Sequence, residues 1–522
     1  MAAPLATMIQ NAMQTDSRYP GALTSESDNH AFPENFHPVT WKSPRPADRY
    51  NLVVLSGGYG GSLTALEAVR AGAKVAVVER NLPGGVCLNS GCIPSKVLLR
   101  TARLYAEMKN GGNYGATMPR AVDIDFAAAM KHMRRVRARI SRRRSASELR
   151  LNGIDVFFGE GRFTGPDAVT VNGATLRFRR ALIATGAHPF IPQIPGPSEA
   201  GYLTNETVFE LTERPRSFLV IGGGPLGCEL AQAFCRLGSR VSIVQDEPLF
   251  LSQEERDAAQ ILSDSLARDG IDIHLNTQIT WVRTKGVRKQ VELVNDDSRS
   301  IFGVDTILVG AGRAPNVQGM NLKAAGVKYD DLNGIRINDF LQTSNPAIYG
   351  AGDVCLEHKF AHIEGASAHF VTQNALFFGR QRLSELTVPW CTYTDPEIAH
   401  VGMYVKEARE KNIAGKTITV PMHEVDRAII DGEDEGFVKI HVKEGTDRIL
   451  GATVVASHAG EMISDISLAI AAGIGLRRLA RASHPYPTQA AAIKLAATTC
   501  CRANRSRSLA WCSRKWMKWQ TL

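Results

Sequence analysis

Residues 50–80 read YNLVVLSGGYGGSLTALEAVRAGAKVAVVER: an apolar run, a glycine-rich turn, a helix-like stretch and a second apolar run that ends at Glu79. Residues 217–245, SFLVIGGGPLGCELAQAFCRLGSRVSIVQ, repeat this plan. The spacing from Ser56 to Glu79 equals that from Gly222 to Gln245, 23 positions. The repeat therefore predicts two nucleotide-binding domains, each built around a strand-turn-helix-strand unit.

The two turns differ in their glycines. The second copy has a complete G-x-G-x-x-G, formed by Gly222, Gly224 and Gly227. In the first copy Ser56 replaces the leading glycine, ahead of Gly58 and Gly61. Such glycines let the strand turn sharply into the helix, so that backbone N–H groups reach a pyrophosphate. A serine fits this turn at negative φ and is strained at positive φ.

Length and composition indicate a globular protein of several domains. The 522 residues exceed what one core supports, and 44% are hydrophobic and 22% charged. Nine cysteines without a dense framework favour a reducing compartment, and we predict the cytoplasm. No apolar run reaches the roughly 18 residues of a membrane helix.

The net charge of +9 is concentrated in residues 131–150 and 502–518. Local basic runs of this kind are typical of solvated helix faces and tails. No nucleic-acid reader motif accompanies them, so we do not expect nucleic-acid binding.

Residues 81–100, NLPGGVCLNSGCIPSKVLLR, place Cys87 and Cys92 five positions apart. Residues five apart in a regular helix lie about 7 to 8 Å apart along its axis, too far for a disulfide. Pro94 favours a helix that begins at about Cys92, with Cys87 in the preceding loop and free to fold back. The helix N-terminus then lowers the pKa of Cys92. Two unpaired buried cysteines are the alternative, and a metal site would need further ligands.

Beside two dinucleotide motifs, this pair resembles the redox centre of the flavoprotein pyridine-nucleotide disulfide oxidoreductases. The similarity extends from about residue 50 to about residue 497 and begins with GGVCLNSGCIPSK, residues 84–96. Five further blocks follow in the family's order: ALIATGAHPFIPQIPG at 181–196, VIGGGPLGCELAQAF at 220–234, VGAGRAPN at 309–316, SNPAIYGAGDVC at 344–355 and WCTYTDPEIAHVG at 390–402.

The resemblance implies an α/β fold with two Rossmann-like domains, for FAD and NAD(P)H, and a C-terminal α+β dimerisation domain. The implied boundaries are a flexible tail at 1–48, an FAD domain at 49–188 and 312–387, an NAD(P)H domain at 189–311, a dimerisation domain at 388–500 and a basic, tryptophan-rich tail at 501–522. It also implies a homodimer whose active site is completed across subunits.

The implied cofactors are FAD and either NADPH or NADH. The implied cofactor-binding residues are Ser56, Gly58, Gly61, Glu79, Thr185, Gly186, Gly222, Gly224, Gly227, Gln245, Gly312 and Asp353. The implied catalytic residues are Cys87, Cys92, Lys96, Glu229 and Tyr486. Glu229 is implied to pair with Lys96, and electrons to pass from NAD(P)H through FAD and the cysteine pair to an acceptor. Gln245 is neither an acid nor an arginine, so the choice between NADH and NADPH stays open.

The far end of the chain bears on the acceptor. Disulfide-reducing members of the family carry His-Pro-Thr-x-x-Glu, but residues 482–501 read ASHPYPTQAAAIKLAATTCC. Alignment on the Pro-Thr pair puts Tyr486 at the histidine and Ala491 at the glutamate. A tyrosine there resembles the mercuric reductase branch. Hg(II) is soft and prefers thiolates, so Cys87 and Cys92 would hold a substrate metal ion transiently.

Two features near the C-terminus have open interpretations. Cys500 and Cys501 resemble the branch's metal-relay pair but lie nearer the Pro-Thr motif, and two thiols packed on the last helix are the alternative. Cys512 has no clear role. Trp511, Trp516 and Trp519 among basic residues could contact an anionic membrane, although packing on the dimer is at least as good an interpretation.

Three hypotheses follow. The first is a mercuric reductase-like flavoenzyme that reduces Hg(II) or another soft or thiol-bound acceptor. The second is dihydrolipoamide dehydrogenase or another disulfide reductase, in which His484 would have to act as the base. The third is a non-catalytic nucleotide-binding redox sensor, suggested by Ser56 in the first glycine turn and by the replacement of the family's C-terminal histidine and glutamate.

Overall fold

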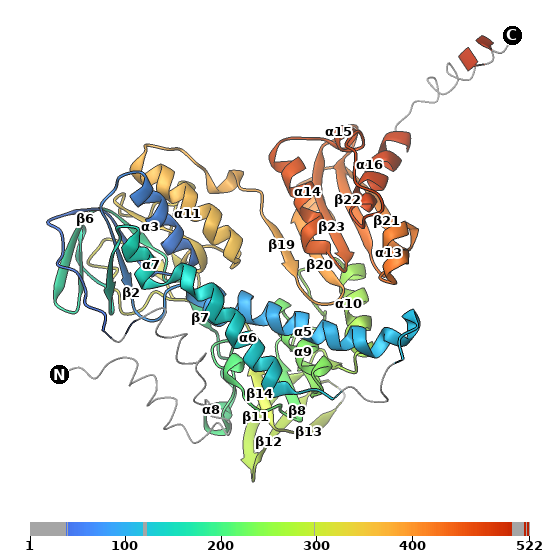
Figure 1. The fold of residues 1–522 in the computed structure, drawn as a ribbon, viewed down its shortest axis with the longest axis horizontal. Helices are drawn as coiled ribbons and strands as arrows, with labels where there is room; N and C mark the ends of the chain where they lie inside the picture. The colour runs from blue at the N-terminus through green and yellow to red at the C-terminus, as the bar shows by residue number, and fades with distance from the viewer. Residues whose placement is uncertain are drawn as a thin grey trace. The chain divides into compact units, whose positions relative to one another are not determined.

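The computed structural model describes residues 38, 40–117, 123–296, 298–503, 516–517 and 519–520 (Figure 1). They fall into two compact units, one within Met1–Leu249 and Asp269–Leu386, the other within Phe250–Arg268 and Thr387–Leu522. Most of the predicted N-terminal tail, and Trp511 and Cys512 in the C-terminal tail, lie outside the described residues. No helix of the described part is long and apolar enough to span a membrane.

The first unit contains a seven-stranded sheet in the order β3-β2-β1-β6-β5-β4, with β18 paired to β6. Its strands are β1 (Tyr50–Leu55), β2 (Val75–Glu79), β3 (Asp155–Phe158), β4 (Arg162–Gly165), β5 (Ala168–Val171), β6 (Ala174–Ile183) and β18 (Ile348–Gly350). β1 pairs in parallel with β2 and with β6. All five residues of β2 are buried, which explains its continuous apolar run.

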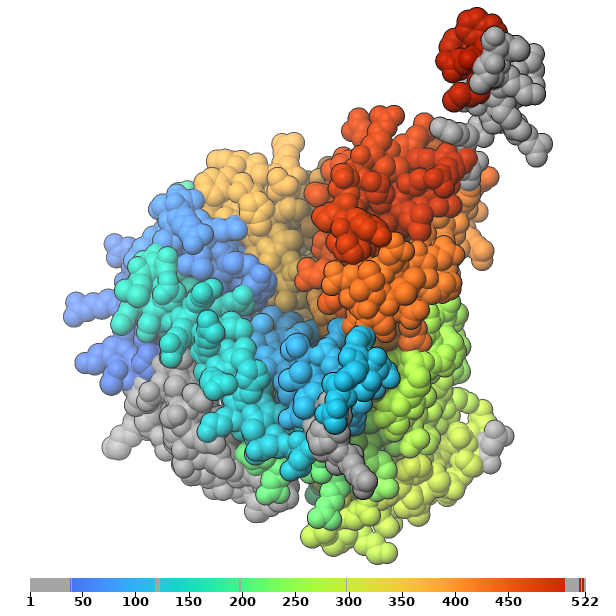
Figure 2. Space-filling model, turned by 45° about the vertical axis from the view of Figure 1, so that its right-hand side comes forward, coloured from blue at the N-terminus to red at the C-terminus, as the bar shows by residue number. Residues whose placement is uncertain are grey.

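Among the described residues, six α-helices belong to this part of the unit, and the first, the fifth and the last of them pack on strands of the sheet. They are α3 (Tyr59–Arg70), α4 (Gly85–Asn89), α5 (Cys92–Asn110), α6 (Phe126–Ser141), α7 (Ala146–Leu151) and α11 (Ala361–Leu376). α3 and α11 lie side by side although some 300 residues separate them in sequence (Figures 1 and 2). β18 pairs with β6 and so returns to the sheet that β1 starts.

The same unit contains the second copy of the repeat. Its parallel sheet runs β10-β9-β8-β14, and a three-stranded antiparallel sheet, β11-β12-β13, accompanies it. The elements are β8 (Ser217–Ile221), α9 (Pro225–Arg236), β9 (Arg240–Val244), β10 (Asp272–His274), β11 (Gln278–Lys285), β12 (Arg288–Val294), β13 (Arg299–Val304) and β14 (Thr306–Val309). The predicted strand-turn-helix-strand unit is thus β8-α9-β9. The short pairs β7 (Ala187–Pro189) with β15 (Arg313–Pro315) and β16 (Tyr329–Asp330) with β17 (Gly334–Ile335) complete the sheets of this unit.

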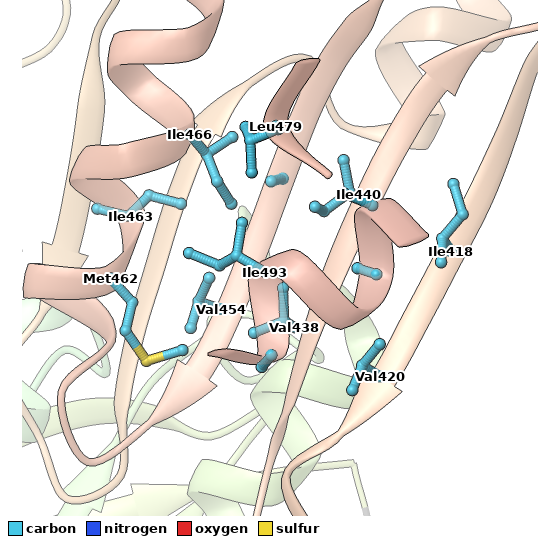
Figure 3. Close-up of a cluster of buried hydrophobic side chains, with 14 of the residues drawn as sticks. Ile418, Val420, Val438, Ile440, Val454, Met462, Ile463, Ile466, Leu479 and Ile493 are labelled. Atoms are coloured by element: carbon cyan, nitrogen blue, oxygen red, sulfur yellow. The ribbon is translucent and has the colours of Figure 1, made fainter. Parts of the chain in front are cut away.

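The second unit is a five-stranded antiparallel sheet in the order β19-β20-β23-β22-β21. Its strands are β19 (Pro389–Thr392), β20 (Glu397–Gly402), β21 (Gly415–Pro421), β22 (Phe437–Lys443) and β23 (Ile449–Ala456). Its helices are α10 (Arg256–Arg268), α12 (Val405–Glu410), α13 (Asp426–Asp431), α14 (Ala459–Ala471), α15 (Leu476–Leu479) and α16 (Ala491–Ala503). Ile440 and Val454 of the sheet pack with Ile466 and Ile493 in one buried apolar cluster (Figure 3).

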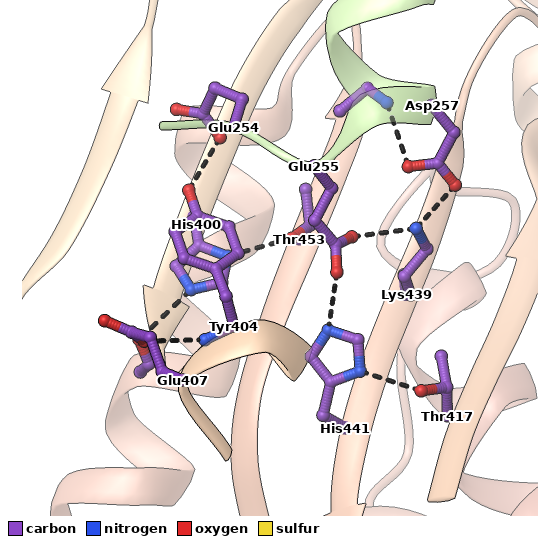
Figure 4. Close-up of polar contacts among 12 residues, drawn as sticks. Glu254, Glu255, Asp257, His400, Tyr404, Glu407, Thr417, Lys439, His441 and Thr453 are labelled. Atoms are coloured by element: carbon purple, nitrogen blue, oxygen red, sulfur yellow. Dashed lines mark hydrogen bonds and ion pairs between the residues drawn. The ribbon is translucent and has the colours of Figure 1, made fainter. Parts of the chain in front are cut away.

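α10 belongs to this unit, although it lies inside the range 189–311 predicted for the NAD(P)H domain. A buried polar cluster holds the start of α10 to the sheet (Figure 4). Lys439 Nζ donates to Glu255 Oε2 at 2.8 Å, and His441 Nε2 lies 3.0 Å from Glu255 Oε1. Tyr404 donates its hydroxyl to Glu254 at 2.7 Å. Apolar periodicity carries no signal for such carboxylate contacts, so the grouping could not be read from the sequence.

Candidate functional site

The first glycine turn joins β1 to α3. A Cβ on Gly61 would lie 2.1 Å from the Ser56 carbonyl oxygen, so only glycine fits there. Ser56 has φ of +94°, in the left-handed region. Its hydroxyl donates to Glu79 Oε2 and accepts from the Gly58 N–H, both at 3.2 Å. The turn thus forms as predicted, but with the strain that a positive φ imposes on a serine.

Glu79 ends β2 beside this turn. Its carboxylate accepts from the backbone N–H groups of Gly57 at 2.6 Å and Asn81 at 2.7 Å. Burial raises the pKa of Glu79, and these hydrogen bonds act against the rise. Glu79, one of the implied cofactor-binding residues, is therefore fixed next to the turn.

The two cysteines lie on consecutive helices. α5 begins at Cys92 and carries Pro94 in its first turn, as predicted. Cys87 lies in the short helix α4, so the prediction of a loop there was wrong. Ser90 and Gly91 connect the two helices, and a Cβ on Gly91 would lie 2.9 Å from the Val86 carbonyl oxygen. This close approach lets Cys87 and Cys92 face each other.

Both cysteines are free thiols in the structure, and they share a hydrogen bond. That bond and the Lys96 cation outweigh burial and lower the pKa of Cys92 to about 7. The same bond, with burial, raises the pKa of Cys87. Cys92 is therefore the thiolate and Cys87 the thiol that donates to it.

Lys96 lies one turn into α5 and reaches across to α9 of the second copy. Its Nζ lies 3.0 Å and 2.8 Å from the two carboxylate oxygens of Glu229, whose side chain is 3% exposed. The ion pair implied by the resemblance is thus present, and it connects the cysteine helix to the second glycine unit.

The other predicted cofactor-binding residues of the first site lie just after β6 and in the segments 310–316 and 350–354. Asp353 is buried, and its carboxylate lies 3.2 Å from Arg313 Nη2. Burial raises the pKa of Asp353, while Arg313 acts against the rise. Thr185 donates to the Asn316 carbonyl at 2.8 Å, and Gly186 and Gly312 have positive φ. These residues shape the edge of the first site.

The second glycine turn joins β8 to α9. A Cβ on Gly227 would lie 2.2 Å from the Gly222 carbonyl oxygen, the same close approach as in the first turn. Gly224 precedes the first residue of α9. Gln245 follows β9 and donates to the Glu247 and Leu249 carbonyls at 3.3 and 2.9 Å.

Tyr486 lies in the second unit and is 78% exposed. Its hydroxyl donates to Asp426 Oδ2 at 2.7 Å, and this hydrogen bond raises the pKa of Tyr486. The side chain of His484 is only 11% exposed, and its Nε2 lies 3.5 Å from Asp465 Oδ2. Its Nδ1 is buried without a hydrogen-bond partner among the described residues. Of Tyr486 and His484, the tyrosine is thus the one whose side chain is exposed to solvent.

The C-terminal cysteine pair lies on α16. Cys500 is buried in the apolar cluster of the second unit, and Cys501 is partly buried. Burial raises the pKa of Cys500. This placement favours the packing interpretation of the pair, and a metal relay stays a prediction.

Comparison with known proteins gives the family. The pattern of "Pyridine nucleotide-disulphide oxidoreductase" matches residues 50–369, and that of its dimerisation domain matches residues 388–497. The chain belongs to this family. As a class I pyridine nucleotide-disulfide oxidoreductase it is an FAD-dependent flavoenzyme that uses NAD(P)H, and both predicted cofactors and the predicted fold class are confirmed. The dimerisation domain supports a homodimer.

The relatives of this oxidoreductase are named for different activities. It is 35% identical over 452 residues to the mercuric reductase of Lysinibacillus sphaericus, and the alignment covers 87% of this chain and 83% of the relative. It is 33% identical over 450 residues to the dihydrolipoyl dehydrogenase of Thermus scotoductus, covering 84% and 95%. The Cu(II) complex of the HOCl-induced flavoprotein disulfide reductase RclA from Escherichia coli superposes with a TM-score of 0.76 at 25% identity, covering 87% and 100%.

The residues of the oxidoreductase fit FAD. The glycine turn places backbone N–H groups at the start of α3, Glu79 lies beside it, and Asp353 faces the same sheet edge. One residue that touches these loops was missed from the sequence, Glu364 in the first turn of α11. No motif marks it, because its neighbours in space are remote in sequence.

Proposed function

We propose that this oxidoreductase transfers electrons from NAD(P)H to Hg(II) or another soft, thiol-bound metal ion held by Cys87 and Cys92. The observation that carries the proposal is the exposed Tyr486 at the position of the family's histidine, with His484 turned toward Asp465. A dithiol that reduces disulfides needs an acid-base group poised near neutral pH, and a tyrosine whose pKa is raised does not provide one. A soft metal ion needs thiolates instead.

The residues have distinct proposed roles. Cys92, with its pKa of about 7, is the thiolate next to the electron donor, and Cys87 is the thiol that meets the acceptor. Lys96 holds the negative charge of Cys92, and Glu229 fixes Lys96. FAD, when bound, supplies the two-electron chemistry that connects the nicotinamide to the cysteine pair.

The remaining assignments are part of the same proposal. FAD is held by Ser56, Gly58, Gly61, Glu79 and Asp353, and NAD(P)H by the turn from Gly222 to Gly227. Tyr486 completes the site of the partner subunit in a homodimer. The reaction balances as NAD(P)H + Hg(II) → NAD(P)⁺ + Hg(0) + H⁺, in which the nicotinamide loses two electrons and the metal gains them.

Anaerobic assays of NAD(P)H oxidation with Hg(II) under excess thiol test this function, with released elemental mercury as a second readout. We expect turnover in the wild type and none in Cys87→Ser or Cys92→Ser. Cys235→Ser is the matched control, because Cys235 lies on α9 and its thiol hydrogen bonds to the Asp269 carbonyl. No mercury release from the flavin-loaded wild type would remove Hg(II) as the acceptor.

A second candidate is a disulfide reductase acting on a small disulfide such as lipoamide, which the similarity to a dihydrolipoyl dehydrogenase favours. His484 would then have to leave Asp465 to act as the base. Lipoamide turnover that Tyr486→Phe leaves intact and His484→Ala abolishes would favour this candidate over the first.

A further inference from the structure

Glu364 lies against the first turn of α3 and the loop after β18, which both belong to the proposed FAD site. A Cβ on Gly60 would lie 3.4 Å from the Glu364 Cβ and 3.2 Å from its carbonyl oxygen. A Cβ on Gly352 would lie 3.1 Å from Glu364 Oε1 and 3.0 Å from its Cγ. The backbone and Cβ of Glu364 therefore fill space that Gly60 leaves open, and its carboxyl group fills space that Gly352 leaves open. α3 follows β1 and the loop with Gly352 follows β18, and both strands belong to the first sheet.

Charged groups surround this carboxyl on several sides. The backbone of Gly60 hydrogen bonds to it, Arg313 attracts it, and Asp353 and Cys92 repel it. Cys87 and Cys355 are the other titratable groups on which its charge acts. Burial, followed by the charge of Asp353, raises the pKa of Glu364 to about 8. Near neutral pH the group is thus largely protonated.

FAD brings a diphosphate with two negative charges to the same loops. An ionised Glu364 would repel the diphosphate, and it would also hold the Gly60 N–H, a donor of the kind that a dinucleotide needs at the start of α3. A protonated Glu364 adds no charge, and its hydroxyl is a donor. The protonation state of this side chain therefore changes the free energy of FAD binding.

We propose that Glu364 is a proton-controlled gate for FAD: the chain binds FAD with Glu364 protonated and loses affinity when Glu364 ionises. The proposal rests on the FAD assignment made above and adds a residue and a mode of control to it. It involves no electron transfer, because one proton is taken up when FAD binds to the ionised form.

Equilibrium titration of the FAD-free protein with FAD, followed by flavin fluorescence from about pH 6 to about pH 9.5, tests the gate. Below pH 8 the wild-type Kd should be nearly constant, and above it the Kd should rise by about tenfold per pH unit. Glu364→Gln keeps the size of the side chain and cannot ionise, so its Kd should not show that rise. Glu357→Gln, an exposed neighbour in sequence, should behave as the wild type.

Calorimetry in buffers of different ionisation enthalpy gives a second readout. Near pH 9 the wild type should take up about one proton per FAD bound, and Glu364→Gln should take up none. Glu364→Ala serves if the glutamine variant does not fold. Equal pH dependence and equal proton uptake in the wild type and a folded variant would overturn the gate. Failure of the wild type to bind FAD at any pH would instead overturn the FAD assignment, and the gate with it.

Discussion

Ser56 is the residue at which the first glycine turn departs from its pattern. A non-glycine residue in the left-handed region costs about 1 to 3 kcal/mol, and the Ser56 hydroxyl also occupies the Gly58 N–H. Ser56→Gly should therefore stabilise the FAD-free protein by about 1 kcal/mol and tighten FAD binding severalfold. Denaturant unfolding and FAD titration measure the two effects.

Asn412→Gly is the matched control for Ser56→Gly, because Asn412 also has positive φ but lies in the second unit. It should leave FAD affinity unchanged. Weaker FAD binding in Ser56→Gly would show that the serine hydroxyl contributes more to the site than its backbone strain costs.

Cys92 has a thiolate whose pKa depends on both members of an ion pair. Lys96→Met removes the cation and should raise the pKa of Cys92 by about one pH unit. Glu229→Gln removes an anion and leaves the cation, so it should lower the same pKa. Titration of the thiolate absorbance in the reduced protein measures both shifts. Shifts of the same sign in the two variants would contradict this electrostatic account.

The residues after β9 bear on the choice of nicotinamide. Positions 241–255 contain no lysine or arginine, and the exposed Asp246 and Glu247 follow Gln245. Their charges would repel a 2′-phosphate, so we expect kcat/KM to favour NADH over NADPH by about tenfold. The double variant Asp246→Asn, Glu247→Gln should reduce the ratio, and Glu206→Gln, an exposed control, should not. A wild type that prefers NADPH would refute this expectation.

The sequence predicted some of the site residues and missed others, for a physical reason. Cys92, Lys96 and the glycine turns belong to short motifs whose function depends on local backbone geometry, so the motif itself predicts their place. Glu364 contacts Gly60 and Gly352 only because α11 packs beside α3. A contact made by packing of remote helices leaves no mark in a local pattern.

At the scale of elements, α10 depends on one buried carboxylate. The side chain of Glu255 is 13% exposed and binds Lys439 and His441 of β22. Burial alone would raise the pKa of Glu255, but these two partners lower it from 4.5 to about 2. The difference corresponds to about 3 kcal/mol. This stability is present above about pH 4.5 and is lost as the pH falls toward 2, because the carboxylate must then take up a proton.

Glu255→Gln should therefore lower the free energy of unfolding by about 3 kcal/mol at neutral pH, and it should remove part of the acid sensitivity of the wild type. Amide hydrogen exchange should rise in α10. Asp264→Asn, on the exposed side of the same helix, is the control. Unchanged exchange in α10 would mean that apolar packing alone fixes the helix.

Helix α4 was not predicted, and its short sequence explains why. It has five residues, no side-chain cap and only Leu88 buried, so neither apolar periodicity nor a capping residue predicts a helix there. α3 and α9, by contrast, each follow a buried strand and a glycine turn, and both were predicted from those neighbours.

At the scale of the whole molecule, the repeat predicted the parallel strands of two sheets because each copy contains its own strands, turn and helix. The C-terminal sheet was predicted only through the family resemblance. Helix α10 comes from a distant part of the chain and is bound to this sheet by ion pairs that the sequence does not reveal.

The homodimer itself offers the last test, because Tyr486 is proposed to act in the site of the partner subunit. Mixed dimers of one Cys87→Ser chain and one Tyr486→Ala chain, isolated with two different affinity tags, then contain one intact site and one doubly damaged site. They should show about half the wild-type turnover with Hg(II), although each parent homodimer should be nearly inactive. If Tyr486 instead acted within its own subunit, both sites of the mixed dimer would each carry one defect. Mixed dimers as inactive as the parents would therefore place Tyr486 in its own subunit's reaction, whereas an active Tyr486→Ala homodimer would place Tyr486 outside the reaction. A pair of Asp465→Asn and Cys87→Ser chains gives the matched control for subunit mixing.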